Sequence, residues 1–301
     1  MPIVELQHVR KAYDTKIAVA DLSFRIEPGT MFGLLGPNGS GKTSTIRMMI
    51  GMTVPDSGTV RLFDQPFRRE LLPRVGYLPE ERGLYKKMKV LDQLIFLGEL
   101  HGLDAATAEK RALAWCDRME ITEAIQKKTE ELSKGMQQKI QFIAALLHEP
   151  ELIIMDEPFS GLDPVNATLL QDTLVDLRNQ GRTILFSTHR MDQVEKLCDA
   201  IALISRGNLV LAGGMREIKS RYPRNRVDII FDGDAGFLDH PTIETAKNYS
   251  GHAEIKLKDG VSAQQLLAAA VGNGTHINHF EVMEPTLEEI FIEAVGGKAD
   301  A

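Results

Sequence analysis

The sequence has few cysteines, few aromatic residues and no long apolar run. The two cysteines, Cys116 and Cys198, lie in helix-like surroundings with no second thiol or histidine at metal-ligand spacing, which argues against a disulfide framework or a zinc site. The longest unbroken apolar runs, 142–147 and 266–271, have six residues each, whereas a membrane-spanning helix needs about 20. We therefore expect two reduced thiols and no membrane span in this sequence.

An excess of positive charge is also absent. The sequence has 35 Lys and Arg against 42 Asp and Glu, a formal net charge of -7. This balance argues against a protein that coats nucleic acid, so no nucleic-acid partner is expected. No apolar stretch follows a basic start, so no signal peptide is expected. The two reduced thiols are those expected of a cytoplasmic protein.

The 301 residues are 43% hydrophobic, enough for about two domains of roughly 150 residues each. Alternating apolar and polar residues at 3–9 and 22–26 predict half-buried strands, and apolar runs at 31–35, 152–155, 183–187 and 200–204 predict buried ones. Helical periodicity dominates 90–128, 134–148 and 166–180. Strands that alternate with helices indicate an α/β fold with a mainly parallel sheet, preceded by an antiparallel β-subdomain and interrupted by a helical insertion at about 84–135.

The character of the sequence changes near Ser220. Residues 219–226 are basic and contain a proline, which is typical of a linker, and short strands are predicted beyond it at 227–231, 253–257 and 277–283. Helices are predicted at 262–271 and from Thr286, where Thr286 and Glu289 form a capping box, to a stop at Gly296. We expect a first domain over 1–222 and a small α+β accessory domain over 223–301.

A glycine-rich turn follows the apolar strand at 31–35. It reads GPNGSGKT and matches the phosphate-loop pattern GxxxxGK[ST] between a strand and a helix. Its backbone N–H groups and the following helix N-terminus favour phosphate, while Lys42 is placed to reach the β and γ phosphates and Thr43 to ligate Mg²⁺. The expected nucleotide-binding residues are Gly36, Pro37, Asn38, Gly39, Ser40, Gly41, Lys42, Thr43 and Ser44.

Two further stretches carry charge or anion-binding character. LIIMDEP ends an apolar strand with Asp156, a candidate Mg²⁺ ligand, and Glu157, a candidate general base for an attacking water. LSKGMQQ, at 132–138, opens a helix with a Ser-x-Gly turn that suits a second anion.

The order of these motifs resembles one family, the ATP-binding subunits of ABC transporters. The series comprises Tyr13, the phosphate loop, YLPE, a helical insertion, LSKGMQQ, LIIMDEP, SGLDP and STH, over about residues 3–219. The resemblance implies a P-loop ATPase that binds ATP and Mg²⁺ as a head-to-tail homodimer, in which Ser133 and Gly135 contact the γ-phosphate bound by the other copy. It also implies that Tyr13 stacks on adenine, that His189 contacts the γ-phosphate, and that Asp163 lies at the dimer seam.

Three positions depart from the family pattern. Glu80, expected to bind nucleotide and metal, replaces the usual glutamine, so a neutral contact to Mg²⁺ and water becomes an anionic one. Lys134 replaces a glycine and Met136 a glutamine in the LSKGMQQ turn, while Ser133 and Gly135 remain. We expect a working site with added positive charge near the phosphate.

The stretches YLPEERGLY and EPTLEEIFIEAV resemble the ATPases of exporters of sodium or drugs, whose membrane subunit is a separate chain. This resemblance implies transmembrane permease partners that hold the chain at the inner face of the membrane. One alternative is a soluble ABC-type ATPase that acts on ribosomes or DNA, although neither a second nucleotide-binding half nor sustained heptads are present. A regulatory ATP-binding module is the other alternative, against which Glu157 argues. The transported substrate is not specified by these residues.

Overall fold

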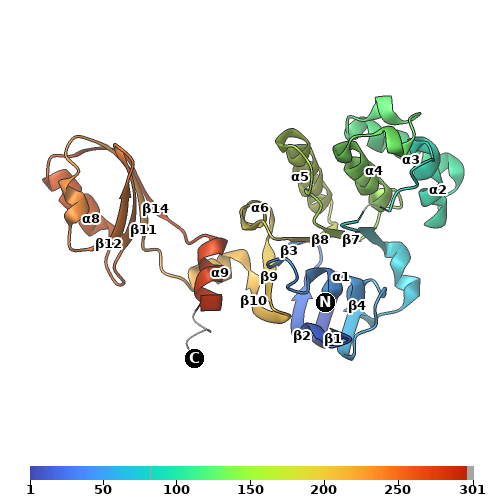
Figure 1. Cartoon of the computed structure of the whole chain (residues 1–301), viewed down its shortest axis with the longest axis horizontal. Helices are drawn as coiled ribbons and strands as arrows, with labels where there is room; N and C mark the ends of the chain where they lie inside the picture. Colours follow the sequence, from blue (N-terminus) through green and yellow to red (C-terminus); the bar gives the residue numbers. More distant parts are fainter. Residues whose placement is uncertain (82, 297–301) are drawn as a thin grey trace. The chain divides into compact units, whose positions relative to one another are not determined.

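The computed structural model describes residues 1–81 and 83–296 and forms two compact units, Met1–Met215 and Arg216–Ala301 (Figure 1). Residues 297–301, predicted to end the accessory domain, lie outside the described residues. The division falls at helix α7, Met215–Ser220, and not after residue 222. Lys219 and Ser220, predicted to begin a linker, belong to this helix.

The N-terminal unit is built on a sheet of ten strands in the order β5-β4-β1-β2-β10-β9-β3-β8-β7-β6. The strands are β1 (Val4–Tyr13), β2 (Lys16–Ile26), β3 (Met31–Leu35), β4 (Ser57–Leu62), β5 (Gln65–Pro66), β6 (Val75–Leu78), β7 (Leu152–Asp156), β8 (Thr183–Thr188), β9 (Ala200–Ser205) and β10 (Asn208–Gly214). Strands β9, β3, β8, β7 and β6 are parallel, while β5, β4, β1 and β2 pair antiparallel. The predicted α/β class with an antiparallel β-subdomain is confirmed.

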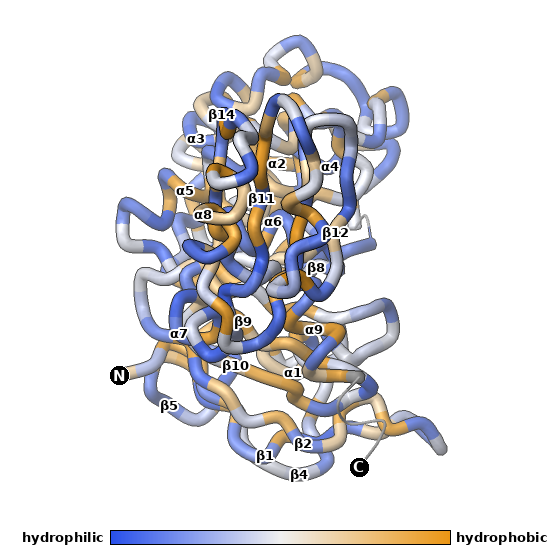
Figure 2. The backbone as a smooth tube through the Cα atoms, turned by 90° about the vertical axis from the view of Figure 1, so that its left-hand side faces the viewer, coloured by the Kyte–Doolittle hydropathy of each residue, from blue (hydrophilic) through white to orange (hydrophobic). Residues whose placement is uncertain are grey.

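The central strands are buried because they are apolar on both faces. All five residues of β3 and of β7 are buried, as are all six of β8. Figure 2 shows hydrophobic stretches along strands and helices and hydrophilic residues mainly in the connecting turns. Such strands need cover on both sides, which places them in the interior of the N-terminal unit.

Helices connect these strands. Their bounds are α1 (Lys42–Met49), α2 (Val90–Leu100), α3 (Ala105–Arg118), α4 (Lys134–Leu146), α5 (Pro164–Asn179) and α6 (Met191–Leu197), with short 3₁₀ turns at Arg69–Arg74, Thr122–Ala124 and Thr129–Glu131. Helices α2, α3 and α4 pack together and form the predicted helical insertion (Figure 1). The expected end of that insertion near residue 135 falls inside α4, which continues to Leu146.

The C-terminal unit has a four-stranded antiparallel sheet in the order β12-β13-β11-β14. Its elements are β11 (Arg226–Asp232), a 3₁₀ turn (Gly236–Asp239), β12 (Ile243–Asn248), β13 (His252–Leu257), α8 (Ala263–Gly272), β14 (His276–Met283) and α9 (Leu287–Gly296). Leu266 and Ala270 of α8 pack on one face of the sheet. The capping box is present, with the Thr286 N–H donating to Glu289 Oε2 at 3.0 Å and the Glu289 N–H donating to Thr286 Oγ1 at 3.3 Å.

Candidate functional site

The phosphate loop connects β3 to α1. Gly36, Gly39 and Gly41 have φ values of 152°, 76° and 113°, a region that favours glycine. A Cβ on Gly41 would also collide with the carbonyl oxygen of Ala18. The backbone of this loop therefore depends on the glycines of the motif.

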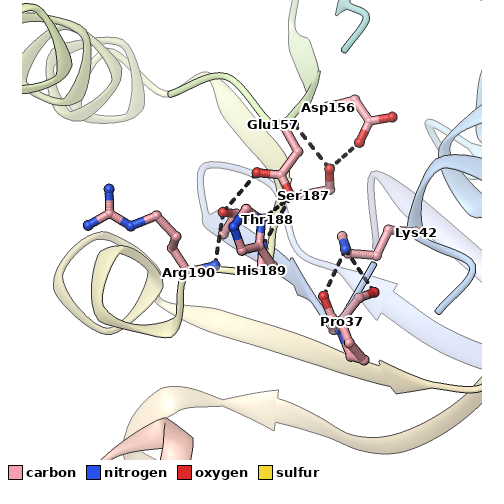
Figure 3. Close-up of polar contacts among 9 residues, drawn as sticks. Pro37, Lys42, Asp156, Glu157, Ser187, Thr188, His189 and Arg190 are labelled. Atoms are coloured by element: carbon pink, nitrogen blue, oxygen red, sulfur yellow. Dashed lines mark hydrogen bonds and ion pairs between the residues drawn. The ribbon is translucent and has the colours of Figure 1, made fainter. Parts of the chain in front are cut away.

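Lys42, the first residue of α1, is only 6% exposed and points back along the loop. Its ammonium donates hydrogen bonds to the carbonyl oxygens of Gly36 at 2.8 Å and Pro37 at 3.2 Å (Figure 3). Burial lowers the pKa of Lys42, and the carboxylates of Glu157, Asp156 and Glu80 oppose that shift. The loop thus holds a cation among three carboxylates, an arrangement suited to bridging a polyanion and its metal.

The carboxyl ends of the parallel strands bring the remaining polar groups to this loop. Strand β8 lies between β3 and β7, with Leu35 opposite Thr188 and Asp156 opposite Ser187. Because parallel strands end at the same edge of the sheet, the phosphate loop, Asp156 and the residues after Ser187 share that edge. The sequence could not show that β8 is the central strand of the three.

Asp156 is 1% exposed and accepts a hydrogen bond from Ser187 Oγ to its Oδ1 (Figure 3). Among the described residues its Oδ2 has no hydrogen-bond partner. A buried carboxylate oxygen without a partner is costly unless a donor or cation meets it. Oxygen ligands beside a phosphate loop are the donors that Mg²⁺ prefers, so this carboxylate fits that ion.

Glu157 has a φ of 50°, an uncommon value for a side chain of this kind. Its Oε2 accepts from the Thr188 hydroxyl at 3.2 Å, and its Oε1 accepts from the His189 backbone N–H at 3.1 Å. The His189 ring nitrogen Nδ1 lies 2.9 Å from the same Oε1. These contacts fix the carboxylate of Glu157 toward the end of β8 (Figure 3).

A cavity of about 320 Å³ lies over the phosphate loop. It is lined by Tyr13, Lys16, Ala18, Asn38, Gly39, Gly41, Lys42, Thr43, Ser44, Glu80, Asp156 and Glu157. The structure thus brings most of the predicted nucleotide and metal residues together. Lys16 and Ala18 were missed because β2 carries no motif at those positions, and Ser187 and Thr188 were missed although both stand in the STH stretch.

Ser133, Gly135, Asp163 and His189 are not among the residues that line this cavity. Ser133 caps the N-terminus of α4, where its Oγ accepts from the Met136 N–H at 3.2 Å. Asp163 caps α5 by accepting from the Asn166 N–H at 3.0 Å, and this hydrogen bond lowers the pKa of the Asp163 carboxyl. The two cap residues thus serve their own helices, and neither lines the phosphate-loop cavity.

A second cavity, of about 370 Å³, is mainly apolar. Its lining comes from the residues after α1, from β6 and the segments on either side of it, and from α2 and α4. The lining residues are Ile50, Met52, Leu72, Val75, Tyr77, Pro79, Gly83, Leu84, Leu97, His101, Gln141, Ala144 and Ala145. Met52 is 66% exposed there. Burial raises the pKa of the Tyr77 hydroxyl to about 12. We call this cavity the apolar groove.

The phosphate loop, the acidic strand end and the mixed sheet define a P-loop ATPase of the ABC type. A family model described as "ABC transporter" matches residues 19–160, and one described as "ATP-binding protein DrrA1-3-like, C-terminal domain" matches residues 213–295. These matches, together with relatives that are 32–44% identical, show that the chain belongs to the ATP-binding subunits of ABC transporters, which bind and hydrolyse ATP.

Three relatives and one solved structure illustrate the likeness. The chain is 44% identical to "Uncharacterized ABC transporter ATP-binding protein YhaQ" of Bacillus subtilis (strain 168), over 98% of this chain and 99% of the relative. It is 32% identical to "Linearmycin resistance ATP-binding protein LnrL" of the same organism, over 98% of each. It is 37% identical to "Nod factor export ATP-binding protein I" of Paraburkholderia xenovorans (strain LB400), over 70% of each. The solved "Structure of ATP binding subunit of ABC transporter" superposes with a TM-score of 0.67 at 28% identity, over 73% of this chain and 92% of that one.

ATP-binding subunits of this kind generally pair with separate membrane subunits. Among residues 1–81 and 83–296, no helix has the length and apolar character needed to cross a bilayer.

Proposed function

We propose that this chain hydrolyses Mg²⁺-ATP as half of a homodimer and that closure of the dimer drives export through separate membrane subunits. The observation that supports the homodimer is the separation of two anion-binding elements. Lys42 and the phosphate loop line the nucleotide cavity, whereas Ser133, at the N-terminus of α4, does not. Both elements favour phosphate, so a second copy docked head to tail supplies the missing half of each site.

Within each site the roles follow from position. Lys42 and the loop from Gly36 to Ser44 bind the phosphates, and Tyr13, 41% exposed at the cavity wall, stacks on the adenine. Thr43, Asp156 and Glu80 hold Mg²⁺, which when bound neutralises charge on the phosphates. Glu157 accepts the proton of the attacking water, and His189 holds Glu157 in place and contacts the γ-phosphate. Ser133, Gly135 and Asp163 act at the seam with the other copy.

The apolar groove supports a membrane-subunit partner. Its lining is mainly apolar, with Met52 exposed at its rim, and an exposed apolar hollow on a soluble chain is typical of a protein contact. Residues of α2 and α4, in the helical insertion, are part of its lining, so a segment docked there senses movement of the insertion when ATP closes the dimer. This contact holds the chain at the cytoplasmic face of the membrane.

The export direction rests on likeness. The relatives named for linearmycin resistance and for Nod factor export, and the DrrA1-3-like match at 213–295, favour an exporter. The cargo class suggested by the sequence is Na⁺ or a drug. Neither is contacted by this chain in the proposed arrangement.

The test is affinity purification of the tagged full chain with Glu157→Gln from detergent-solubilised membranes of its own cells, with Mg²⁺-ATP present. We expect a polytopic membrane protein in stoichiometric amount. Met52→Asp, in the groove, should lose that protein, whereas Leu113→Asp, at a 39% exposed position of α3 outside the groove lining, should retain it. Recovery of ribosomal or DNA-bound partners, or of no membrane protein, contradicts the transport proposal.

A further inference from the structure

Strand β14 is an unguarded edge of the C-terminal sheet. It stands last in the order β12-β13-β11-β14, so its outward N–H and C=O groups have no strand partner in the part of the chain that the structure describes. Edge strands are usually protected by Lys, Pro or irregular pairing. β12, at the other edge, carries Lys247 and a register irregularity between Ile243 and Thr245. β14 has one irregularity of its own, between Ile277 and His279, but no lysine, arginine or proline, so His279–Met283 is its unprotected part.

The C-terminal half of β14, residues 279–283, pairs regularly with β11 and is mostly exposed. Its register with β11 runs evenly from His279, opposite Ile230, to Met283, opposite Arg226. His279, Glu281 and Met283 lie on the face away from α8, while Phe280 and Val282 lie on the α8 face, opposite Ile229 and Val227. Val282 and Met283 are 41% and 39% exposed. The strand thus offers free backbone groups and exposed apolar area together.

A second copy of the same strand fits this edge in one register. A two-fold axis normal to the sheet pairs antiparallel strands so that residues on the same face are opposite one another. Centred on Phe280, it sets each His279 opposite the partner's Glu281, and Phe280 opposite Phe280. Centred on Glu281 it sets two carboxylates against each other, and centred on His279 it sets two imidazoles together. Of these three central registers, the one on Phe280 gives complementary pairs.

We propose that β14 pairs with β14 of a second copy, centred on Phe280, so that the C-terminal units join two chains through one continuous sheet. The evidence is the regular, unpaired edge at 279–283, its exposed apolar side chains and the hydrogen-bond complementarity of the His279 imidazole with the Glu281 carboxylate, which within one chain already lie 3.3 Å apart. The contact uses no nucleotide and does not depend on the proposed ATP-driven closure. It is the kind of strand addition by which exposed sheet edges recognise partners.

The register can be tested by cross-linking the full chain without nucleotide. We expect His279→Cys mixed with Glu281→Cys to form a disulfide-linked dimer on mild oxidation, since opposite residues lie about 5 Å apart. Each variant alone should remain unlinked, because the diagonal separation of about 7–8 Å is too long for a disulfide. The native Cys116 and Cys198 are buried and do not compete. Linking of either variant alone, or no linking of the mixture, overturns the proposed register.

Substitution and exchange of the side chains at positions 279 and 281 provide an independent test of the register. His279→Glu sets two glutamates opposite each other and should reduce nucleotide-free dimerisation at least tenfold in sedimentation experiments. The exchanged variant His279→Glu, Glu281→His restores the pairing and should restore the dimer. Lys42→Ala, which disables the nucleotide site, should leave this dimer unchanged, so failure here is distinguishable from failure of the ATP-dependent one. A dimer unaffected by His279→Glu, or not restored by the exchange, contradicts the proposal.

Discussion

The carboxylate of Glu157 is held by the residue that follows the neighbouring strand: its Oε1 lies 2.9 Å from Nδ1 of His189 and accepts the His189 backbone N–H at 3.1 Å. Glu157→Gln keeps the size of the side chain and an oxygen that can accept these hydrogen bonds, but it removes the general base. We expect ATP hydrolysis to fall by about 10²–10⁴-fold with ATP binding retained. Phosphate release and nucleotide binding measured on the same preparation check this. Glu109→Gln, on the exposed surface of α3, is the matched control, and equal rates for wild type and Glu157→Gln contradict the assignment.

His189→Ala removes the imidazole but leaves the backbone donor to Glu157. Groups that orient a functional side chain typically account for about 10–100-fold, and we expect a loss of that size in kcat with little change in KM. In the Glu157→Gln background the part of this loss that comes from orienting Glu157 should disappear, because both changes act on one unit. Any loss that remains measures the contact of His189 with the γ-phosphate. Independent, multiplying losses in the double variant show that His189 does not act through Glu157.

Much of this arrangement could be predicted from the sequence. Phosphate-loop residues lie consecutively on one turn, so GPNGSGKT fixes both the strand before it and the helix after it. The partners of Asp156 and Glu157 could not be predicted, because Ser187 and Thr188 reach them through the pairing of β8 with β7, which depends on strand order. Strand β10 was missed because NLVLAGG ends in two glycines, which are unfavourable in strands, yet its pairing with β9 compensates.

Glu80 lines the nucleotide cavity, and its carboxylate acts to raise the pKa of Lys42 against the effect of burial. Its charge therefore affects the electrostatics of the site. Glu80→Gln should raise the Mg²⁺ concentration needed for half-maximal ATPase activity by about fivefold, since a charge pair 4 Å apart in water is worth about 1 kcal/mol. Glu81→Gln is the control, because Glu81 is not among the cavity residues. A half-maximal concentration that does not change in Glu80→Gln shows that Glu80 does not meet the metal.

Lys134 is the first residue of α4 and is exposed next to the cap Ser133. If this N-terminus meets the γ-phosphate of a second copy, Lys134→Glu should weaken ATP-driven dimerisation by about tenfold, through loss of one attractive charge and gain of a repulsive one. The measurement is sedimentation in a Glu157→Gln, His279→Glu background, where the proposed contact through β14 is weakened. Lys110→Glu on α3 is the control. If Lys134→Glu dimerises as strongly as Lys110→Glu, the N-terminus of α4 does not contact the phosphate of a second copy.

His148 stacks on His101, with ring centroids 3.9 Å apart, and its Nε2 lies 3.1 Å from the Val75 carbonyl oxygen. Burial, with the nearby His101 and Arg111, lowers the pKa of His148 from 6.5 to about 4. The pKa of His148 is lower in the folded chain than in the unfolded chain. The contribution of neutral His148 to the free energy of unfolding is therefore complete above pH 6.5 and is lost as the pH falls toward 4. We expect a loss of about 3 kcal/mol in the free energy of unfolding over that window.

Chemical denaturation of the isolated chain at several pH values checks this. His148→Gln, which keeps a donor for the Val75 carbonyl but does not titrate, should show a flatter profile between pH 6.5 and 4. A wild-type profile as flat as that of His148→Gln contradicts the assignment of this acid sensitivity to His148.

The central claim, that two copies complete each other's ATP site, is tested most directly by sedimentation of the Glu157→Gln, His279→Glu chain with and without Mg²⁺-ATP. We predict one copy without nucleotide and two with it, and no shift when Ser133→Arg fills the α4 N-terminus. A chain that binds ATP but sediments as one copy under both conditions contradicts the claim.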